Sequence, residues 1–468
     1  MIVVFAALLS GAMFYLSQGL DNVWALAWLA PVPVLWLAYG ETPLWQVILV
    51  SVVATLASMI YVAQCYMMMP WMILLAVLVL QAACFTTAVL FGRYVHRRAP
   101  PVTTLWAFPV CWTTFEYLTE YASPHGTFGS FAYSQVSAPL LIQSASLFGL
   151  YSVTFLICLF ANTIAMALRN RRESAVAIAV GLSICGLNIA FGLMRLAAPQ
   201  PETVRVAAMV DETTVVTAFH EGTLEADVRV SDAYANAIRS VAAEGAKFVV
   251  TPEGGIFSKA AWRSAVLAPL AAASKETGTH VIAGVLQVEP WGDLAFSLEP
   301  DGTERSYAKR HPVPGLEDRF TPGRASGWLG NGRAVQICKD MDFPRTVRPD
   351  AENGVRLMGA PAGDFVLDAW LHGRMAIMRG VENGFALVRA ANDGMLTASD
   401  AQGRLIASKT AAPTGMTMIV ADLPLGPGPT LYTRIGDAFA WLCVSASLVL
   451  GAYVFQRRTP LGREMLPL

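Results

Sequence analysis

The sequence predicts a chain with two kinds of structure, a bundle of about eight membrane-spanning helices and a water-soluble α/β domain. The first observation is the distribution of charge: residues 1–200 hold 7 Lys or Arg and 5 Asp or Glu, residues 201–432 hold 22 and 27, and residues 433–468 hold 4 and 2. The second is that long apolar runs occur only in the two outer regions, whereas short β-rich runs alternate with helical patterns in the middle one. We therefore expect a membrane domain with seven spans at 1–200, a soluble domain at 201–432, and a last span with its tail at 433–468.

The overall composition excludes several classes of protein. Of the 468 residues, 55% are hydrophobic and only 14% are charged, whereas an ordinary soluble domain carries roughly a quarter charged residues. Disordered, collagen-like and highly charged nucleic-acid-binding proteins are thereby excluded. We expect no nucleic acid among the partners of this chain.

The apolar runs have the length of membrane spans, since a spanning helix needs about 20 mostly apolar residues. The runs lie near 2–18, 23–40, 45–66, 70–92, 103–119, 138–168, 174–194 and 434–455. No Lys or Arg precedes Arg93, so the first run lacks the basic start of a signal peptide. The alternative is a globular protein with buried apolar helices, and seven such runs within 200 residues argue against it.

The arginines near the ends of these runs predict the orientation, because cytoplasmic loops carry an excess of Lys and Arg. Three basic clusters follow runs four, six and eight: Arg93, Arg97 and Arg98; Arg169, Arg171 and Arg172; and Arg457 with Arg458. All three fall on one side if both termini are cytoplasmic and the chain spans the membrane eight times. Arg195 and Arg434 are discordant. The 201–432 domain is then expected on the extracytoplasmic side.

Two features of the membrane part have alternative interpretations. Glu116 lies in the fifth run, and an ionisable group at membrane depth is costly and often functional. It is equally compatible with a solvated position near the outer interface. The loop 123–135 mixes Gly with aromatic residues and has no basic residue, which fits either a mouth that faces lipid or an aromatic belt at the interface.

The middle region predicts an α/β fold, in which helices cover sheets. The expected strands are Val204–Val210, Phe248–Thr251, His280–Gln287, Ala334–Cys338, Val355–Ala360 and Phe385–Ala391. The expected helices are Leu224–Ala243, Ala260–Lys275 and Ala369–Asn383. No dinucleotide, phosphate-loop or metal-ligand motif occurs and the six histidines are scattered, so we expect neither a cofactor nor a metal.

Cys338 is the one cysteine of the middle region; the other six lie in predicted spans. It has no disulfide partner within its domain, and a lone extracytoplasmic thiol is a liability unless it is buried or used. It ends an apolar strand and precedes the charged turn Lys339–Asp342. An inert core thiol and a nucleophile both fit this position.

Two further residues strengthen the interpretation of Cys338 as a nucleophile. Glu253 follows a buried strand at a Pro- and Gly-rich turn, and Lys309 lies near the end of another strand. A carboxylate can deprotonate a thiol, and an ammonium group can stabilise the oxyanion of a tetrahedral intermediate. Together the three side chains suit acyl transfer through a thioester.

The order Glu253, Lys309, Cys338 resembles the Glu–Lys–Cys triad of the nitrilase, or carbon–nitrogen hydrolase, superfamily, which implies an α-β-β-α sandwich. Glu317 matches a second glutamate eight residues after the lysine, and Arg389–Gly394 is similar to a strand and turn near the domain's end. Eight spans around such a domain resemble the apolipoprotein N-acyltransferase family. Four segments of the membrane part look like that family: Leu29–Pro31, Trp112–Glu116, Tyr133–Gln135 and Leu141–Tyr151.

The resemblance implies a reaction in two steps at the bacterial inner membrane. Cys338 would take an acyl chain from a membrane phospholipid, with Glu253 as the base, Lys309 stabilising the oxyanion and Glu317 supporting them. The thioester would pass the chain to the N-terminal amine of a diacylglyceryl-cysteine lipoprotein.

The sequence departs from that family in two places. Lys339 and Asp340 follow the nucleophile where the family has an aromatic residue and a glutamate, and Lys339 is expected to favour the thiolate. Residues 360–372 replace the family's Asn-Asp-Ala-Trp-Phe loop. Two interpretations are open for this segment: a different acceptor pocket, or packing and capping of the following helix, by Asp364, Asp368, Trp370 and His372. The departures leave two alternatives. One is a membrane-tethered amidase or acyltransferase that acts on another substrate. The other is a catalytically silent scaffold, and the complete set of Glu253, Lys309 and Cys338 argues against it.

Overall fold

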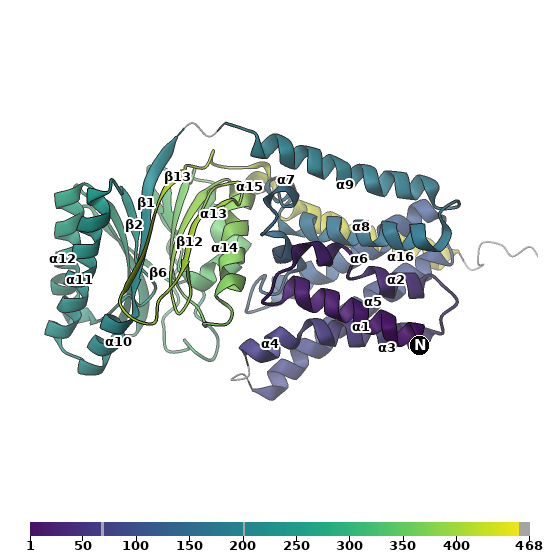
Figure 1. Ribbon diagram of the computed structural model, residues 1–468, viewed down its shortest axis with the longest axis horizontal. Coiled ribbons are helices and arrows are strands. Elements are labelled where there is room, and N and C mark those ends of the chain that lie inside the picture. The colour runs from purple at the N-terminus through teal and green to yellow at the C-terminus, as the bar shows by residue number, and fades with distance from the viewer. Residues whose placement is uncertain (67–69, 200–201, 458–468) are drawn as a thin grey trace, which may run out of the picture. The chain divides into compact units, whose positions relative to one another are not determined.

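The computed structural model describes residues 1–66, 70–199 and 202–457, and the chain divides into two compact units (Figure 1). The helical unit comprises Met1–Ala122, Gly129–Leu196 and Ile435–Leu468, and the α/β unit comprises Ser123–Phe128 and Ala197–Arg434. Six residues of the loop predicted to lie outside the membrane, Ser123–Phe128, thus belong to the α/β unit. We describe each unit separately.

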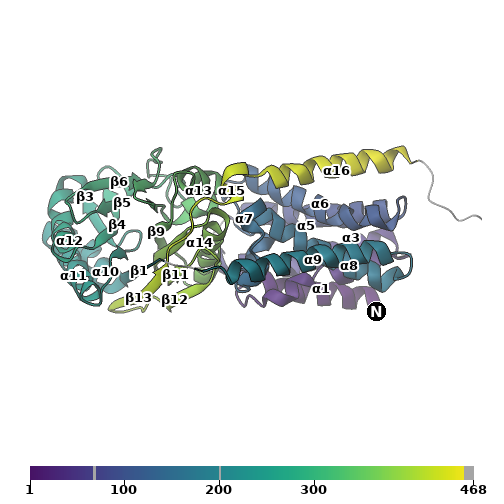
Figure 2. The same ribbon diagram turned by 90° about the horizontal axis from the view of Figure 1, so that it is seen from above.

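The helical unit consists of long helices that run roughly along a common direction, joined by short turns and 3₁₀ segments (Figure 2). In chain order its elements are α1 (Ile2–Gln18), η1 (Trp24–Trp28), α2 (Val32–Ala38), α3 (Leu44–Ser58), α4 (Ile60–Cys65), α5 (Trp71–His96), α6 (Pro101–Ala122), η2 (Phe131–Gln135), η3 (Pro139–Leu141), α7 (Ala145–Phe148), α8 (Leu150–Asn170), α9 (Ala175–Leu196) and α16 (Ala438–Gln456). Each predicted apolar run coincides with one or more of these helices.

Five helical segments of the described residues are long and apolar enough to cross a membrane: Leu44–Cys65, Trp71–His96, Leu150–Asn170, Ala175–Leu196 and Ala438–Gln456. The other three predicted spans correspond to α1, to η1 with α2, and to α6. The first two are short, and α6 carries the acidic residues Glu116 and Glu120. The number of eight spans therefore remains a prediction, and Arg458 of the last basic cluster lies outside the described residues.

One predicted run is divided in the structure. The run 138–168 begins with the short helices η3 and α7, and the long helix α8 starts only at Leu150. Gly149 separates them with φ of 76°, a backbone conformation that is costly for any residue with a Cβ atom. Apolar composition continues through this break, so hydropathy by itself did not reveal it.

The α/β unit is built from two sheets that face each other, with helices on both outer faces (Figure 1). The strands are β1 (Thr203–Asp211), β2 (Phe248–Val250), β3 (Ile256–Lys259), β4 (His280–Val288), β5 (Gly292–Leu298), β6 (Glu304–Ala308), β7 (Trp328–Gly330), β8 (Arg333–Val335), β9 (Leu357–Gly363), β10 (Ala386–Asn392), β11 (Met395–Ser399), β12 (Leu405–Thr410) and β13 (Met416–Pro424). One sheet has the order β13-β1-β2-β4-β5-β6, with β3 also paired to β4, and the other has the order β12-β11-β10-β9-β8-β7.

The helices of this unit form the two outer layers. They are α10 (Glu212–Glu221), α11 (Leu224–Ala243), η4 (Ala260–Trp262), α12 (Arg263–Thr277), η5 (Cys338–Asp342), α13 (Pro344–Ala351) and α14 (Ala369–Asn383), followed by α15 (Leu431–Ile435) at the boundary of the unit. The helices α11 and α12 cover the first sheet, and α13 and α14 lie on the outer side of the second (Figure 1). This is an α-β-β-α sandwich, as the resemblance implied.

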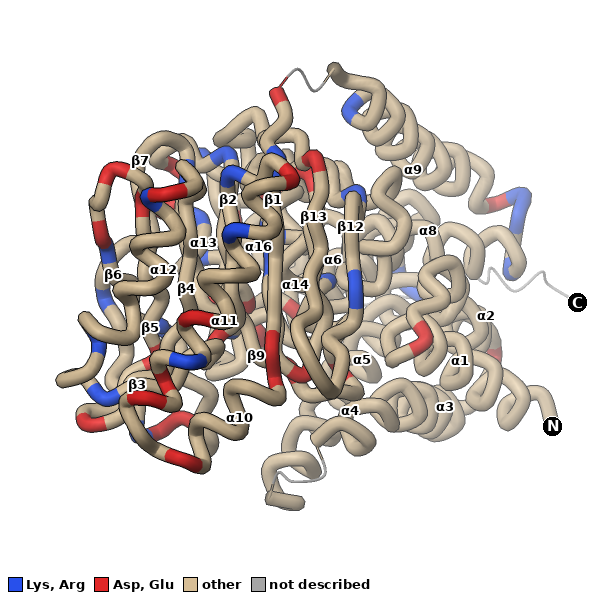
Figure 3. The backbone as a smooth tube through the Cα atoms, turned by 60° about the vertical axis from the view of Figure 1, so that its left-hand side comes forward, with Lys and Arg blue, Asp and Glu red and all other residues tan. Residues whose placement is uncertain are grey.

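The strand β1 shows why the sequences of the inner strands are apolar at successive positions. Its residues Val206, Ala208 and Val210 lie in the core between the two sheets, whereas Ala207 and Met209 lie in the core under α11 and α12. A strand with a core on each face must be apolar at every position. Charged residues are accordingly distributed along the outer elements of this unit and are sparse along the long helices of the other (Figure 3).

Candidate active site

Lys309 is the centre of a buried cluster of charged groups in the α/β unit. It follows β6, and its Nζ lies 2.6 Å from Glu253 Oε1, 2.8 Å from Glu317 Oε1 and 3.2 Å from Asp293 Oδ2. The side chain of Lys309 is only 1% exposed. The structure thus joins Lys309 to the two predicted glutamates and to Asp293 of β5, which sequence reasoning missed because nothing next to Asp293 marks it as a site residue.

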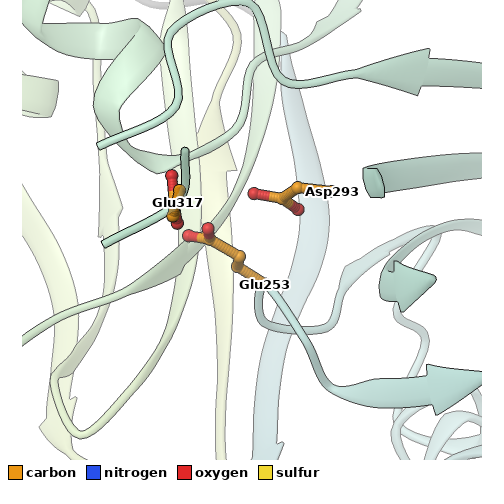
Figure 4. Close-up of side chains that lie close together, drawn as sticks. All are labelled: Glu253, Asp293 and Glu317. Carbon is orange, nitrogen blue, oxygen red and sulfur yellow. The ribbon is translucent and has the colours of Figure 1, made fainter. Parts of the chain in front are cut away.

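The three carboxyl groups also have a spacing compatible with a metal ion. Glu253, Asp293 and Glu317 each offer an oxygen atom, and these atoms lie within 4.8 Å of one another (Figure 4). The ammonium group of Lys309, however, already contacts all three carboxyl groups. A metal ion would have to displace it, so the donor set fits a lysine better than a metal.

The backbone around Glu253 is held by several hydrogen bonds at the end of β2. The Glu253 N–H donates to Ala362 O at 3.2 Å, and Asn392 Nδ2 donates to Glu253 O at 2.5 Å. The neighbouring strand β4 approaches this turn so closely that a Cβ atom at Gly284 would collide with the Pro252 carbonyl group. Glu253 is therefore fixed by contacts from three strands.

Cys338 begins the short helix η5 and does not belong to a strand. The strand β8 ends at Val335, so the predicted strand Ala334–Cys338 is shorter than expected. Cys338 has φ of 41°, a left-handed conformation that costs a non-glycine residue about 1–2 kcal/mol and is found mainly at functional sites. Its Sγ donates a hydrogen bond to Gly363 O, at the end of β9, at 3.3 Å.

Electrostatics keep Glu253 and Lys309 charged. Burial raises the pKa of Glu253, but the charge of Lys309 and hydrogen bonds from Asp293, Lys309 and Cys338 outweigh it and lower the pKa to about 2. Burial lowers the pKa of Lys309, and the charges of Glu253 and Asp293 raise it well above its ordinary value. Burial and the charge of Glu253 raise the pKa of Asp293 well above its usual range. One proton is thus expected on Asp293 while Glu253 is a carboxylate.

Cys338 is a thiol at neutral pH in this environment. Burial raises its pKa well above the ordinary value, and the charge of Glu253 adds to the effect. The cations that act against this increase are Lys309 and Arg389. Lys339 has its Nζ 3.2 Å from His125 Nδ1 and 3.5 Å from Asp342 Oδ2, and the stabilisation of a thiolate that we expected from it does not follow from this geometry.

Asp340 connects η5, the helix that begins at Cys338, to the segment that carries Lys309, a role that sequence reasoning did not assign. Its carboxylate accepts hydrogen bonds from Tyr307 Oη at 2.7 Å, from the Arg310 N–H at 3.0 Å and from the His311 N–H at 2.9 Å. The side chain is fully buried. The only signal in the sequence is an acidic residue two positions after the cysteine.

The residues of the atypical loop lie at the start of α14 and at the end of β9. Asp364 forms a buried ion pair with both terminal nitrogen atoms of Arg389. Asp368 Oδ2 lies 3.1 Å from His372 Nε2, and Trp370 is half-buried in the first turn of α14. Because Asp364 is fully engaged by Arg389, it is not positioned as a free group for an acceptor.

Glu116 belongs to the helical unit, whereas the other candidate residues belong to the α/β unit. Its Oε1 accepts hydrogen bonds from Ser130 Oγ at 2.7 Å and Thr154 Oγ1 at 2.6 Å, and its Oε2 accepts one from the Phe131 N–H at 3.1 Å. The structure therefore brings Glu253, Lys309, Glu317 and Cys338 to one place and leaves Glu116 in another.

Comparison with known proteins extends over both units. Residues 221–426 match the carbon–nitrogen hydrolase family, and residues 10–163 match the apolipoprotein N-acyltransferase N-terminal domain. The chain is 26% identical to the apolipoprotein N-acyltransferase of Geobacter metallireducens, over 97% of this chain and 95% of that protein, and 25% identical to that of Vibrio vulnificus, over 97% of both. Among solved structures, an amidase of the nitrilase superfamily from Nesterenkonia sp. AN1 is similar, with 20% identity, a TM-score of 0.42 and coverage of 53% of this chain and 98% of that one.

The family match of the α/β unit, together with its sandwich of two sheets, defines the class of protein. The chain is an enzyme of the carbon–nitrogen hydrolase superfamily. The match of residues 10–163 to the apolipoprotein N-acyltransferase N-terminal domain then narrows the class. The chain belongs to the apolipoprotein N-acyltransferase family.

Proposed function

We propose that this protein transfers an acyl chain from a membrane phospholipid to the N-terminal amine of a diacylated lipoprotein, with Cys338 as the covalent carrier. The observation that carries the proposal is the set of contacts around Lys309, which joins an ionised carboxylate to an ammonium group beside a half-buried thiol. The similarity to named apolipoprotein N-acyltransferases over 97% of the chain supplies the substrate class.

In the first half-reaction, Glu253 acts as the base. Its Oε1 is bound to Lys309, and no N–H group of the described residues donates to its Oε2, which leaves that oxygen to take the proton of Cys338. The thiolate then attacks the ester carbonyl of the phospholipid, and Lys309 stabilises the oxyanion. The lysophospholipid leaves with the proton that Glu253 held, and an acyl thioester remains on Cys338.

Two further residues, Glu317 and Asp293, support the proposed reaction by holding Lys309. Glu317 holds Lys309 from a second side at 2.8 Å and accepts the Val313 N–H at 2.6 Å, so it fixes both the ammonium group and its own loop. Asp293 holds Lys309 from a third side. An ammonium group fixed from three directions needs little reorganisation when the oxyanion forms, which is the basis of its catalytic effect.

We further propose that the chain lies in the bacterial inner membrane with eight spans and both termini in the cytoplasm. The domain boundaries would be 1–200, 201–432 and 433–468, with the catalytic domain on the periplasmic side. Five segments with the length and composition of spans, and the arginines after predicted spans four, six and eight, support this topology. Both substrates are anchored in the bilayer, so a catalytic domain beside the membrane surface is the expected arrangement.

The alternative of a membrane-tethered amidase with another substrate has less support. The similarity to named acyltransferases includes the helical unit, which a hydrolase of small amides would not require. The departures at Lys339 and in the 360–372 loop concern the residues around the triad, and the contacts among Glu253, Lys309 and Glu317 are intact.

The experiment that tests the proposal uses the purified protein in detergent with phosphatidylethanolamine. Intact-mass measurement is expected to show one acyl adduct on Cys338, which disappears when a diacylated lipopeptide with a free amine is added. Cys338→Ala is expected to form no adduct, and Cys443→Ala, a cysteine of α16, is the matched control. Absence of an adduct with every phospholipid tested would contradict the proposal.

A further inference from the structure

The second half-reaction has a chemical requirement that the first does not have. An N-terminal amine has a pKa of about 7.7–8.0, so much of the acceptor arrives as an ammonium ion, which has no lone pair for attack on the thioester. A base must remove a proton from nitrogen before the C–N bond forms. In the first half-reaction, by contrast, the proton comes from the thiol.

Glu253 is already engaged by the groups of the first half-reaction. Its Oε1 is bound to Lys309, and it faces the thiol of Cys338, whose proton it takes in the proposed acylation step. A general base is most efficient when its pKa lies near the operating pH. The site therefore benefits from a second base.

His372 and Asp368 form a pair with the geometry of such a base. His372 Nε2 lies 3.1 Å from Asp368 Oδ2. A carboxylate only accepts hydrogen bonds, so Nε2 of the neutral ring carries the proton and Nδ1 carries the lone pair. Asp368 is fully buried and also accepts the Phe365 N–H at 3.1 Å, whereas the side chain of His372 is 19% exposed. The carboxylate is thus fixed and the ring is accessible.

The His372–Asp368 pair lies near residues that contact Cys338 and its helix η5. The Cys338 thiol is bound to Gly363 O at the end of β9, and the next residues form the loop that leads through Asp368 into α14. On another side, the His372 ring lies 5.9 Å from that of Phe128, while the adjacent Thr127 donates to Asp342 O in η5, the helix that Cys338 begins.

The loop before α14 exposes an apolar surface that suits contact with a lipid substrate. Between Asp364 and Asp368 the loop exposes three apolar side chains in succession, Phe365, Val366 and Leu367, of which Val366 is 73% exposed. Apolar residues exposed in a row are uncommon on a soluble surface and mark sites of contact with a partner or a lipid. If the acyl chains of an acceptor contact these apolar side chains, its amine would lie near Asp368 and His372.

Building on the proposed function, we propose that His372, oriented by Asp368, is the base that takes a proton from the ammonium group of the acceptor. Nδ1 binds that proton, the amine lone pair forms the C–N bond to the thioester carbonyl, and the C–S bond breaks with its electron pair on sulfur. The second proton of the nitrogen passes to the sulfur and restores the thiol. His372 then releases its proton to water, and the product is an amide.

The charges around His372 support this role. Burial lowers its pKa, but the hydrogen bond and the charge of Asp368, followed by the charges of Asp364 and Asp342, raise the pKa above the ordinary value. These carboxylates come from the loop before α14 and from η5; Lys339 is the ion-pair partner of Asp342, and the Phe128 ring adds no charge. The shift brings the histidine closer to the pKa of an α-amine.

The test separates the two half-reactions. Acylation of Cys338 by phosphatidylethanolamine is followed by intact mass, and transfer is followed as loss of the adduct after addition of a diacylated lipopeptide. For His372→Asn we expect acylation within about threefold of the wild-type rate and transfer at pH 7 slower by about 10²-fold, the lower range of general base catalysis. His220→Asn, on the exposed helix α10, is the matched control and is expected to change neither step.

Two further measurements distinguish a base from a structural residue. The deficit of His372→Asn in transfer is expected to shrink above pH 8, and to nearly vanish with methoxyamine, an acceptor that is neutral at pH 7. If H372N does not fold, Asp368→Asn is expected to show the same split between acylation and transfer. Transfer at the wild-type rate, or equal loss in both half-reactions, would overturn the inference and leave the proposed function intact; no adduct in the wild type would overturn both.

Discussion

The two units each contain one buried glutamate that the sequence marks as unusual, and their surroundings differ. Glu116 in α6 and Glu253 after β2 are both 8% exposed. The hydrogen-bond donors to Glu116 are two hydroxyl groups and a backbone N–H, all neutral. Glu253 is bound to the ammonium group of Lys309 and lies next to a thiol. Burial alone therefore does not distinguish the two glutamates; a fixed cation and a nearby thiol support the proposed catalytic role of Glu253.

The contacts of Glu116 explain its place in the helical unit. Through Ser130 and Phe131 it is bound to the start of η2, and through Thr154 it is bound to α8. It thereby joins three segments of the unit, and this arrangement suits a structural role. In the α/β unit the corresponding structural roles fall to Asp340 and Asp364, and Glu253 is available for chemistry.

The largest expected effect comes from removing the cation of the Glu253 site. Lys309→Met leaves three carboxyl groups buried without their ammonium partner, and loss of one member of a buried ion pair typically costs about 3–5 kcal/mol. We expect a marked fall in the midpoint of thermal unfolding of the detergent-solubilised protein and no acyl adduct on Cys338. Lys259→Met, which removes an exposed ion pair with Glu289, is the control and is expected to cost less than about 1 kcal/mol.

The next largest expected effect is the difference in acylation rate between variants of Glu253 and of Glu116. Glu253→Gln removes the base and is expected to slow acylation of Cys338 by about 10³-fold, within the range for general base catalysis. Glu116→Gln keeps a carbonyl oxygen for the hydroxyl groups, and we expect acylation within about threefold of wild type. Glu116→Ala leaves buried donors unpaired and is expected to lose about 1–3 kcal/mol of stability. A large loss of acylation in Glu116→Gln would show that the comparison is wrong.

The smallest effect concerns the protonated partner of Glu253. Because the pKa of Asp293 is raised in the folded state, its stabilising contribution is complete below the unfolded pKa of about 3.9 and is lost as pH rises toward the folded value. Asp293→Asn removes this dependence, so the stability of the variant relative to wild type should improve between pH 4 and pH 7. An unchanged difference over the same range would mean that Asp293 is already ionised in the folded protein at pH 4.

Much of the fold was predictable because it follows from hydrophobic pattern. The predicted helices Leu224–Ala243 and Ala369–Asn383 agree with α11 and α14 at both ends. Thr223 caps the start of α11, and Gly384 in a left-handed conformation ends α14. The predicted strands of the inner layers also agree, to within a few residues. The break at Gly149 was missed because it depends on a positive φ in an otherwise apolar run. The predicted strand that ends at Cys338 extends beyond β8, which ends at Val335.

The candidate site was predictable only in part. Glu253, Lys309 and Cys338 were found because chemically suitable residues at strand ends have a recognisable order. Asp293 and Asp340 were missed because each lies in an ordinary-looking segment and acquires its role from a partner distant in sequence. Lys339 was expected to act on its neighbour Cys338, yet its ammonium group is directed to His125 and Asp342.

The sequence by itself determined the division into an apolar helical part and an α/β part and indicated Cys338 as the candidate nucleophile, because these depend on composition, periodicity and residue type. The layers of the α/β unit were implied by the family resemblance. The tertiary structure decided which carboxylate is paired with the lysine, whether the cysteine is a thiol, and which polar group the loop 123–128 contacts. Such properties depend on distances between groups that are far apart in the chain, and a pKa or an ion pair changes with a few ångströms.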